Sequence, residues 1–340
     1  MLRYLTAGES HGRFLTGILE GFPAGVKMPS GYLAAQLRRR RLAPGRGARQ
    51  AKETDDFEII SGLSGSVTTG APITVLIKNA GRDLPPPSSL PRPGHADLAG
   101  MLKYNTLNAV LIRERASARE TAARTALGSF ALRLHELLGI AINSRVLSLG
   151  RLPSITAATA AAELLRARSA GDTLGGVFEL SVEGLPAGLG SCAQADRRLG
   201  ARLGAALLGV NGVKGFEIGG GFALAELGGI EASEYPELSG GLDGGMTNGR
   251  GLILRCAVKP VPGLPGGAPS TDLKTFKRKL SVSSTSDTTA VFAAAVVAEH
   301  AAALELADAL LEKFGGDSLG ELKRRLDEWR KETGRVLGRL

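Results

Sequence analysis

The sequence predicts an α/β protein built from two related halves, and three observations support this. The segment EGFPAG at residues 20–25 recurs as EGLPAG at residues 183–188. Each copy follows an apolar, strand-like run and precedes a segment with helical spacing. The chain has 340 residues, of which 43% are hydrophobic, enough for a large core. The alternative is a chance likeness between two Pro-Gly turns.

The first half is expected to contain strands over residues 14–19, 66–78 and 141–149, helices over 33–41 and 117–138, and a loop over 81–97. The second helix should end at Gly139, since glycine commonly terminates helices. The loop is rich in proline and polar residues, and long loops in compact domains usually serve function.

The second half is expected to contain strands over residues 177–182, 215–222 and 252–258, and helices over 195–210 and 288–314. Leu319, Leu322, Leu326 and Trp329 follow helical spacing, which predicts an amphipathic helix that packs on the body or on another subunit. We therefore expect one domain over residues 1–340. Its halves would cover about 1–150 and 175–315, and a C-terminal helix would cover 316–340.

Charge and cysteine content narrow the classes of function. A net charge of +9 favours acidic partners, which could be a nucleic acid, an anionic membrane, or small phosphorylated and carboxylated molecules. Aromatic residues make up only 4%, which disfavours a nucleic-acid-binding protein that stacks bases; binding of RNA or another polyanion remains the alternative. Two cysteines without a CxxC motif indicate a reducing cytoplasm and no metal site, and no apolar run is long enough to span a membrane.

Two of the four histidines are candidates for proton transfer. His11 lies in the motif GESHG and His95 in RPGHAD, where flanking glycines present a side chain instead of packing it. The ordinary pKa of histidine lies near neutrality, which suits general acid–base chemistry. His135 and His300 lie in Ala- and Leu-rich helical segments and are expected to be ordinary helix residues.

The basic run 38–41, followed by Arg46 and Arg49, allows three interpretations. It could be a solvated helix end, a clamp for phosphate and carboxylate groups, or a nucleic-acid patch. In the clamp, Gly45 and Gly47 would let the backbone close around a ligand, and the local sequence does not decide between the clamp and the solvated helix end.

Two further polar residues precede predicted helices. Ser117 and Glu120 match a capping box, yet a helix start also binds anions, and Arg113 and Arg115 lie just before it. Asp287 could be the N-cap of the late helix or a carboxylate that accepts a proton. The sequence has no P-loop or HExxH motif.

The order of these motifs resembles the chorismate synthase family from Met1 to about Phe314. The motifs are GESHG at residues 8–12, the Arg40–Arg46 region, RPGHAD at 92–97, RASARET at 115–121, KGFEIG at 214–219, GGMTNG at 244–249, and Ser286-Asp287.

The resemblance implies a carbon–oxygen lyase acting on phosphates, at the last common step of the shikimate pathway towards aromatic amino acids. Its substrate is 5-enolpyruvylshikimate 3-phosphate, which loses phosphate by anti-1,4-elimination to give chorismate. Reduced FMN is required without net redox change, and either NADPH or an external flavin reductase supplies it. The absence of a GxGxxG fold favours the external reductase. The resemblance also implies a homotetramer and a single domain with internal pseudo-symmetry whose sheets are sandwiched between helices.

The resemblance assigns roles to matching residues. His11 would protonate the leaving phosphate, His95 would stabilise the reduced flavin, and Asp287 would work with the flavin on the C6 proton. Ser10 and Ser117 would assist this relay. The residues expected to bind substrate are Arg40, Arg46, Arg49, Arg92 and Arg115. Those expected to contact the flavin are Arg115, Ala116, Ser117, Asn211, Gly212, Gly244, Lys259, Pro260, Val261, Pro262, Gly263 and Thr285.

The chain departs from the family pattern at several positions. Thr285 replaces a usual arginine, Ala116 replaces a serine, and Gln50 replaces a methionine. Serines common after Lys259-Pro260 are missing, and the family's Gly-Tyr-Gly-Arg-Gly segment reads APGRG at residues 43–47. These changes leave open a member that binds ligands but turns over slowly.

Overall fold

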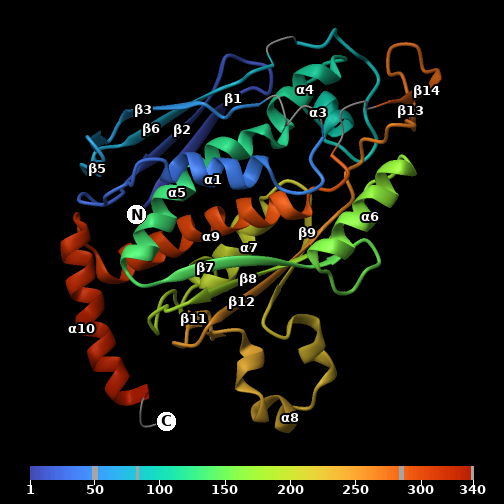
Figure 1. Cartoon of the computed structure of the whole chain (residues 1–340). Coiled ribbons are helices and arrows are strands. Elements are labelled where there is room, and N and C mark those ends of the chain that lie inside the picture. The colour runs from blue at the N-terminus through green and yellow to red at the C-terminus, as the bar shows by residue number, and fades with distance from the viewer. Residues whose placement is uncertain (48–52, 82–83, 283–286, 338–340) are drawn as a thin grey trace.

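The computed structural model describes residues 1–47, 53–81, 84–282 and 287–337, and it contains two four-stranded antiparallel sheets with helices between them (Figure 1). The first sheet has the order β1 (Arg3–Gly8), β2 (Phe14–Glu20), β6 (Ile73–Lys78) and β3 (Phe57–Ser61). The second has the order β7 (Ala141–Leu149), β8 (Gly176–Glu183), β12 (Leu252–Val258) and β9 (Val213–Ile218). Three two-stranded ribbons are β4 (Leu63–Ser64) with β5 (Val67–Thr68), β10 (Leu242–Asp243) with β11 (Met246–Thr247), and β13 (Ala268–Thr271) with β14 (Arg278–Ser281).

Four helices form the layer between the sheets: α1 (Tyr32–Arg41), α5 (Thr121–Leu137), α7 (Leu199–Leu208) and α9 (Val291–Phe314). The other helices are α3 (Asp97–Lys103), α4 (Ala109–Ala116), α6 (Ala157–Ser169), α8 (Gly229–Glu234) and α10 (Leu319–Leu337). Short 3₁₀ turns are η1 (Ala118–Glu120), η2 (Ala195–Arg197), η3 (Gly221–Glu226) and η4 (Pro236–Ser239).

The predicted α/β class is confirmed, but the order of the layers is the reverse of the expected one. Helices α5 and α9 pack against each other, and each packs on one sheet, α5 on β2 and β6 and α9 on β7 and β8. Most residues of both helices are buried, so neither helix could lie outside a sheet. The strands alternate buried and more exposed residues, as expected for antiparallel sheets with one solvated face.

The repeat found in the sequence corresponds to the same topology in both sheets. Strand order β1-β2-β6-β3 in the first sheet corresponds to β7-β8-β12-β9 in the second. The two Pro-Gly turns also make the same contacts. Thr68 Oγ1 donates to Pro23 O at 2.7 Å, and Thr247 Oγ1 donates to Pro186 O at 2.6 Å. Shared local hydrogen bonding shows that the likeness of the two turns is structural and not a coincidence.

The predicted element boundaries agree with the structure for some strands and not for others. Strands β7 and β12 coincide with the predicted ranges, whereas the strand expected over residues 66–78 divides into β5 and β6. Helix α5 begins at Thr121, after η1, and the expected capping box does not form. Ser117 Oγ accepts from Arg119 N at 3.2 Å, while the Glu120 carboxylate accepts from Arg124 at 2.7 Å. The Glu120 carboxylate therefore pairs with Arg124, whereas in a capping box it would accept a hydrogen bond from the backbone N–H of Ser117.

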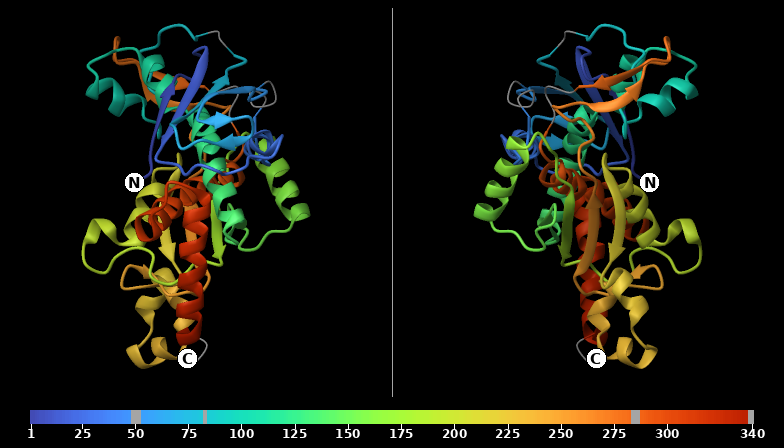
Figure 2. Two further views of the ribbon diagram at one scale, coloured as in Figure 1. Left: turned by 90° about the vertical axis from the view of Figure 1, so that its left-hand side faces the viewer. Right: turned by 90° about the vertical axis from the view of Figure 1, so that its right-hand side faces the viewer.

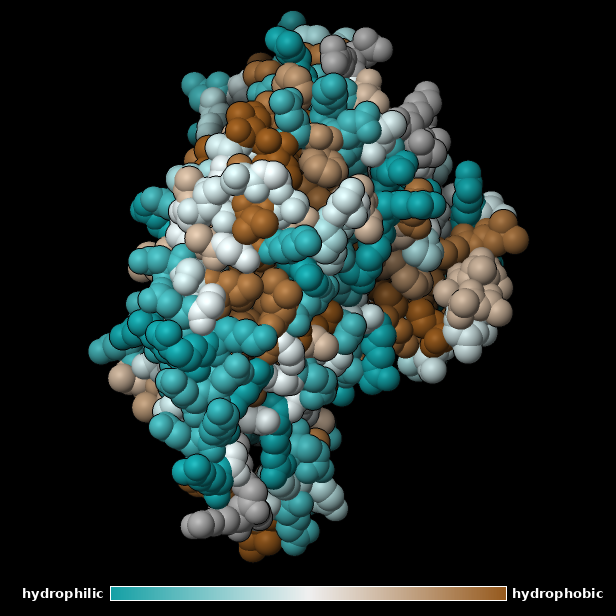
Figure 3. Space-filling model, turned by 60° about the vertical axis from the view of Figure 1, so that its left-hand side comes forward, coloured by the Kyte–Doolittle hydropathy of each residue, from teal (hydrophilic) through white to brown (hydrophobic). Residues whose placement is uncertain are grey.

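The C-terminal helix α10 links the two halves. Leu322 and Leu326 are fully buried, Trp329 Nε1 donates to Ala187 O at 2.9 Å, and Arg330 donates to Leu138 O and Gly184 O at 2.8 Å. Figure 2 shows the helix extending along the molecule to the C-terminus, and its outer surface is mostly hydrophilic (Figure 3). None of the described helices combines the length and apolar character needed to cross a membrane.

The contact between α5 and α9 requires a glycine and buries two histidines. A Cβ at Gly128 would lie 2.7 Å from the backbone oxygen of His300, so only glycine allows this close approach. His135 and His300 are fully buried in these helices, as predicted for ordinary helix residues. Burial lowers the pKa of each from 6.5 to about 4, because a charged imidazole would lose its hydration.

These two histidines predict acid sensitivity. Their folded-state pKa lies below the unfolded value, so the unfolded chain binds more protons and stability falls as the pH decreases from 6.5 towards 4. At pH 5 each should cost about 2 kcal/mol relative to pH 7.5. Urea unfolding at both pH values should give a smaller difference for His135→Leu/His300→Leu than for the unchanged protein. Equal differences would contradict this assignment.

Candidate active site

The Ser10–His11 segment is a tight loop between β1 and β2. Gly8 has φ of 103°, and a Cβ there would lie 2.4 Å from Phe14 O, so this loop geometry excludes a larger residue. The buried side chain of Asn79, just after β6, donates to Glu9 O at 2.9 Å and to Gly12 O at 2.8 Å. The loop is therefore fixed at both of its ends by one amide.

The imidazole of His11 is held from helix α4. Glu114 Oε1 lies 2.6 Å from His11 Nδ1, and Glu114 Oε2 accepts from the backbone N–H of His11 at 2.7 Å. The backbone of Glu114 also accepts from Ser10 N at 3.0 Å. One residue thus fixes both the loop backbone and the direction of the histidine ring.

The two candidate serines meet at the end of α4. Ser10 Oγ donates to Ser117 Oγ at 3.2 Å, and Asn211 Nδ2 donates to Ala116 O at 3.4 Å. Ser10 and Ser117 belong to the first half of the chain and Asn211 to the second. The end of α4 is therefore a contact point between the halves, where ligand sites are common.

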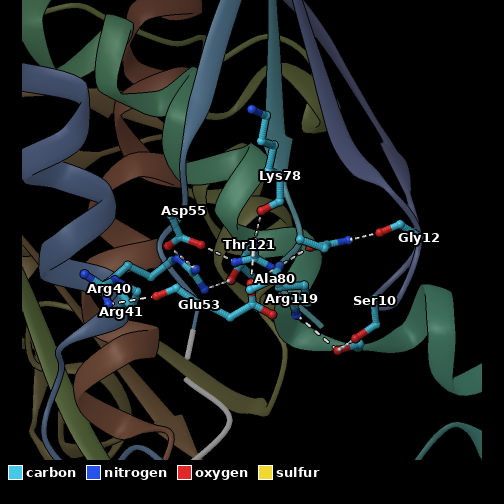
Figure 4. Close-up of polar contacts among 12 residues, drawn as sticks. Ser10, Gly12, Arg40, Arg41, Glu53, Asp55, Lys78, Ala80, Arg119 and Thr121 are labelled. Carbon is cyan, nitrogen blue, oxygen red and sulfur yellow. Dashed lines mark hydrogen bonds and ion pairs between the residues drawn. The ribbon is translucent and has the colours of Figure 1, made fainter. Parts of the chain in front are cut away.

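Beneath this loop lies a buried ion-pair network around Arg119. Its guanidinium binds the Asp55 carboxylate, donates to Asn79 Oδ1 at 2.8 Å and to Lys78 O at 3.0 Å, and lies 3.3 Å from Glu53 Oε2. Figure 4 shows Arg119 at the centre of these contacts, with Ser10 and Gly12 on one side and Asp55 on the other. Through Asn79, this network supports the loop that carries His11.

Arg40 belongs to the same network. It donates to Asp55 Oδ2 at 2.8 Å and to Thr121 Oγ1 at 3.4 Å, and its side chain has no exposed surface. Burial lowers the pKa of Arg40 to about 10, while the two arginines outweigh the effect of burial on Asp55 and keep its pKa below the usual value. In this conformation Arg40 supports the site from within, and its predicted contact with substrate would require the pair to open.

Arg92 and His95 lie on the 84–96 loop, which leads into α3. Asp97, fully buried, accepts from Arg92 Nε at 3.1 Å and from Arg113 Nε at 2.7 Å. Burial alone would raise the pKa of Asp97, but hydrogen bonds from these arginines hold it below the usual value. The pKa of His95 is lowered, chiefly by burial and then by the charge of Arg92.

The segment 259–263 lies against the His95 loop. Lys259 Nζ donates to Gly94 O, its backbone N–H donates to Gly212 O at 2.9 Å, and Pro262 lies beside Gly94. Burial, followed by the charge of Lys214, lowers the pKa of Lys259. The second half of the chain therefore contributes a cation and a proline-rich segment beside His95.

Asp287 pairs with the loop after α1 and does not cap α9. Its carboxylate accepts from Arg46 NH1 at 2.5 Å and from Gly47 N at 2.7 Å. The N-cap of α9 is Ala290, which has no side-chain bond. The capping alternative is therefore wrong, because the carboxylate bonds to residues more than 200 positions earlier in the chain.

A short segment before β8 joins the Asp287 region to the Lys259 region. Thr173 Oγ1 donates to Val261 O at 2.7 Å, and Leu174 N donates to Thr288 O at 2.8 Å. Together these contacts form one continuous set of candidate residues, here named the motif cluster. Its members are Ser10, His11, Arg46, Arg92, His95, Ala116, Ser117, Asn211, Gly212, Lys259, Pro260, Val261, Pro262, Gly263 and Asp287.

Several candidates lie outside the motif cluster. Gly244 forms the turn between β10 and β11, and Figure 1 shows this ribbon far from α3 and α4. Arg115 turns away and donates to Thr6 O and Thr6 Oγ1 at 3.0 Å. Arg49 and Thr285 fall outside the described residues. A cavity of about 700 Å³ between α1, α6, β7 and α9 is lined by Arg38 and Arg39 of the basic run but by none of the residues that the family resemblance assigns to the site.

Sequence analysis missed three polar residues that organise the cluster. These are Asn79 and Asp55, which lie in unremarkable polar segments, and Glu114, which interrupts the basic sequence Arg113-Glu114-Arg115. A lone carboxylate between two arginines beside a predicted anion site was the available signal for Glu114. Nothing in the local sequence marks Asn79, whose role depends on contacts with segments 40 and 70 residues away.

Two histidines, an acid and several arginines gathered by an α/β scaffold define an enzyme suited to proton transfer on an anionic substrate. The family model described as chorismate synthase matches residues 2–311. A chorismate synthase of Caldanaerobacter subterraneus is 44% identical over 96% of this chain and 98% of its own length. A chorismate synthase of Desulforamulus reducens is 42% identical over 99% of this chain and 100% of its own length. A crystal structure of chorismate synthase has a TM-score of 0.78 at 34% identity and covers 97% of this chain and 98% of its own.

The chain therefore belongs to the chorismate synthase family. It is a carbon–oxygen lyase of the shikimate pathway, and its reaction eliminates phosphate from 5-enolpyruvylshikimate 3-phosphate to give chorismate.

Removing Arg119 should destabilise the protein strongly. Arg119→Met would leave Asp55 and Glu53 buried with too few cations, and breaking such a buried pair costs about 3–5 kcal/mol. Arg166→Met is the matched control, since its pair with Glu163 is exposed and such pairs contribute about 1 kcal/mol or less. Urea unfolding measures both. A loss for Arg119→Met no larger than for the control would show that the network is dispensable.

Proposed function

We propose that the motif cluster binds 5-enolpyruvylshikimate 3-phosphate together with reduced FMN, and that His11, His95 and Asp287 handle the protons of the reaction. The observation that carries this proposal is the continuity of the cluster. Direct contacts link groups that lie between 88 and 241 residues apart in the sequence. Such convergence of polar groups is unusual unless they serve one site.

On the substrate side, His11 protonates an oxygen of the leaving phosphate. Loss of phosphate concentrates negative charge on that oxygen, and a cationic imidazole compensates it. Ser10 and Ser117 hold the adjoining position through their mutual hydrogen bond. Arg46 and Arg92, partly buried members of the cluster, offer guanidinium groups that suit the phosphate and carboxylates of the substrate.

On the cofactor side, the described residues fit a planar heterocycle with ring N–H groups. Asn211 Oδ1 is buried and has no hydrogen-bond partner among the described residues, so it can accept from such a ring. Lys259 and His95 adjoin it through Gly212 and Gly94. Reduced flavin supplies electron density that assists the loss of phosphate. Its reductant would be an external flavin reductase, with NADPH as the alternative.

Asp287 accepts the proton that leaves C6 of the substrate. Gly47 N–H and Arg46 orient its carboxylate, so that a defined oxygen can face the substrate. Arg46 then has two partners, Asp287 and the anionic substrate, which would couple binding of substrate to the release of the base.

The alternative function, binding of RNA or another polyanion, has less support. Arg40, Arg46, Arg92 and Arg119 pair with carboxylates within the protein, so they do not form a free basic surface. We further propose a cytoplasmic homotetramer, in line with the absence of any CxxC motif and with the exposed apolar residues Leu5, Ile18 and Ile60 on the outer face of the first sheet.

Anaerobic turnover with chemically reduced FMN tests the proposal. The protein should release phosphate from 5-enolpyruvylshikimate 3-phosphate, and His11→Ala and Asp287→Asn should each lower kcat by about 100-fold or more, because each removes a proton-transfer group. Arg166→Ala, on the exposed face of α6, should retain the full rate. Full activity of either site variant would remove that residue from the mechanism, and no turnover by folded protein would indicate an inactive family member.

A further inference from the structure

The contact between Glu114 and His11 carries an inference beyond the roles given above. Glu114 is 5% exposed at its side chain, and His11 is 18% exposed. Both carboxylate oxygens of Glu114 are directed at the same residue, one at Nδ1 and one at the backbone N–H. A buried carboxylate whose two oxygens both bind the same histidine controls the position of that ring.

Glu114 binds His11 although an arginine lies on each side of it in the sequence. Arg113 and Arg115 adjoin Glu114 in the sequence, yet Arg113 donates to Asp97 and to Leu90 O, and Arg115 donates to Thr6. Neither arginine therefore competes for the carboxylate in this structure. Helical geometry explains the separation, since consecutive residues point about 100° apart around α4.

The contact also determines which ring nitrogen is free. A carboxylate accepts hydrogen bonds only, so its bond to Nδ1 requires a proton there. Nε2 is then the nitrogen that can exchange a proton with a ligand.

We propose that Glu114 is a positioning residue that fixes the tautomer and orientation of His11, so that Nε2 faces the leaving phosphate of the substrate. The proposal rests on the role given to His11 in the proposed function. Glu114 itself does not touch the substrate and acts only through His11.

Glu114→Gln tests this directly, because glutamine has nearly the same shape but only one accepting atom. If the glutamine oxygen still accepts the hydrogen bond from the backbone N–H of His11, the glutamine NH₂ group faces Nδ1. Nδ1 must then act as an acceptor, so the ring proton moves to Nε2. If the glutamine amide is turned the other way, its NH₂ group faces the backbone N–H of His11, and two donors oppose each other. The variant cannot satisfy both bonds, although it should fold because it introduces no new charge.

Nitrogen-15 NMR of histidine-labelled protein without ligands reads the tautomer independently of activity. At alkaline pH, where the ring is neutral, His11 should carry its proton on Nδ1 in the unchanged protein and on Nε2 in Glu114→Gln. The His11 signals are assigned by their loss in His11→Gln. A proton on Nε2 in both proteins would overturn the proposal, whatever the role of His11 in turnover.

Kinetics provide the second readout. Glu114→Gln should lower kcat by about 100-fold with less than about a threefold change in KM, because the group acts on proton transfer and not on ground-state binding. Glu114→Asp should recover part of kcat, since it restores the carboxylate with a shorter reach. Glu163→Gln, which alters an exposed pair on α6, is the control and should leave kcat unchanged.

The outcomes separate this inference from the proposed function. A tautomer change in Glu114→Gln without loss of kcat would show that the ring orientation is irrelevant, and would overturn the role given to Glu114 in catalysis. If His11→Ala also retains its rate, the proposed function of His11 fails as well. An increase in KM at unchanged kcat would indicate that Glu114 serves substrate binding, which also contradicts the proposal.

Discussion

The buried guanidinium of Arg119 is the constraint on which the rest of the site depends. It lies between the Asp55 and Glu53 carboxylates and the carbonyl group of Asn79. A buried cation must be paired, and a buried carboxylate must be paired in turn, so these groups determine one another's positions. Because Asn79 uses its amide N–H groups for Glu9 O and Gly12 O, the position of Arg119 is passed on to the loop that carries His11.

The remaining site follows from how the two halves meet. The first half supplies the His11 loop, the end of α4 and the His95 loop, and the second supplies Asn211, Lys259 and Asp287. Their arrangement depends on α5 and α9, which cross at Gly128 and connect the two sheets. The protein thus places proton-transfer groups on loops while a close-packed helical layer keeps those loops in register.

Much of the fold and of the candidate site could be predicted from the sequence, but several features could not. The repeated Pro-Gly turn revealed the two halves because turn chemistry is local, and His11 and His95 were recognisable from their glycine neighbours. The layer order that the family resemblance implied was wrong, and the strand and helix patterns could not correct it because they do not state which layer is outermost. Asp287 resembled a helix cap locally, and its bond to Gly47 depends on a contact 240 residues away. Arg40 was expected to bind substrate, with a solvated helix end as one alternative, and only the tertiary fold buries it against Asp55.

The most direct test of this account is amide hydrogen exchange in Asn79→Ala. Removing the side-chain amide should speed exchange of the Ser10 and His11 N–H groups by about tenfold or more, because the loop loses both hydrogen bonds from Asn79 and keeps only those to Glu114. Exchange in the centre of α5, around Phe130, should change little, since that helix is buried independently of the loop. Unchanged protection at Ser10 and His11 would contradict the claim that the Arg119 network holds the catalytic loop through Asn79.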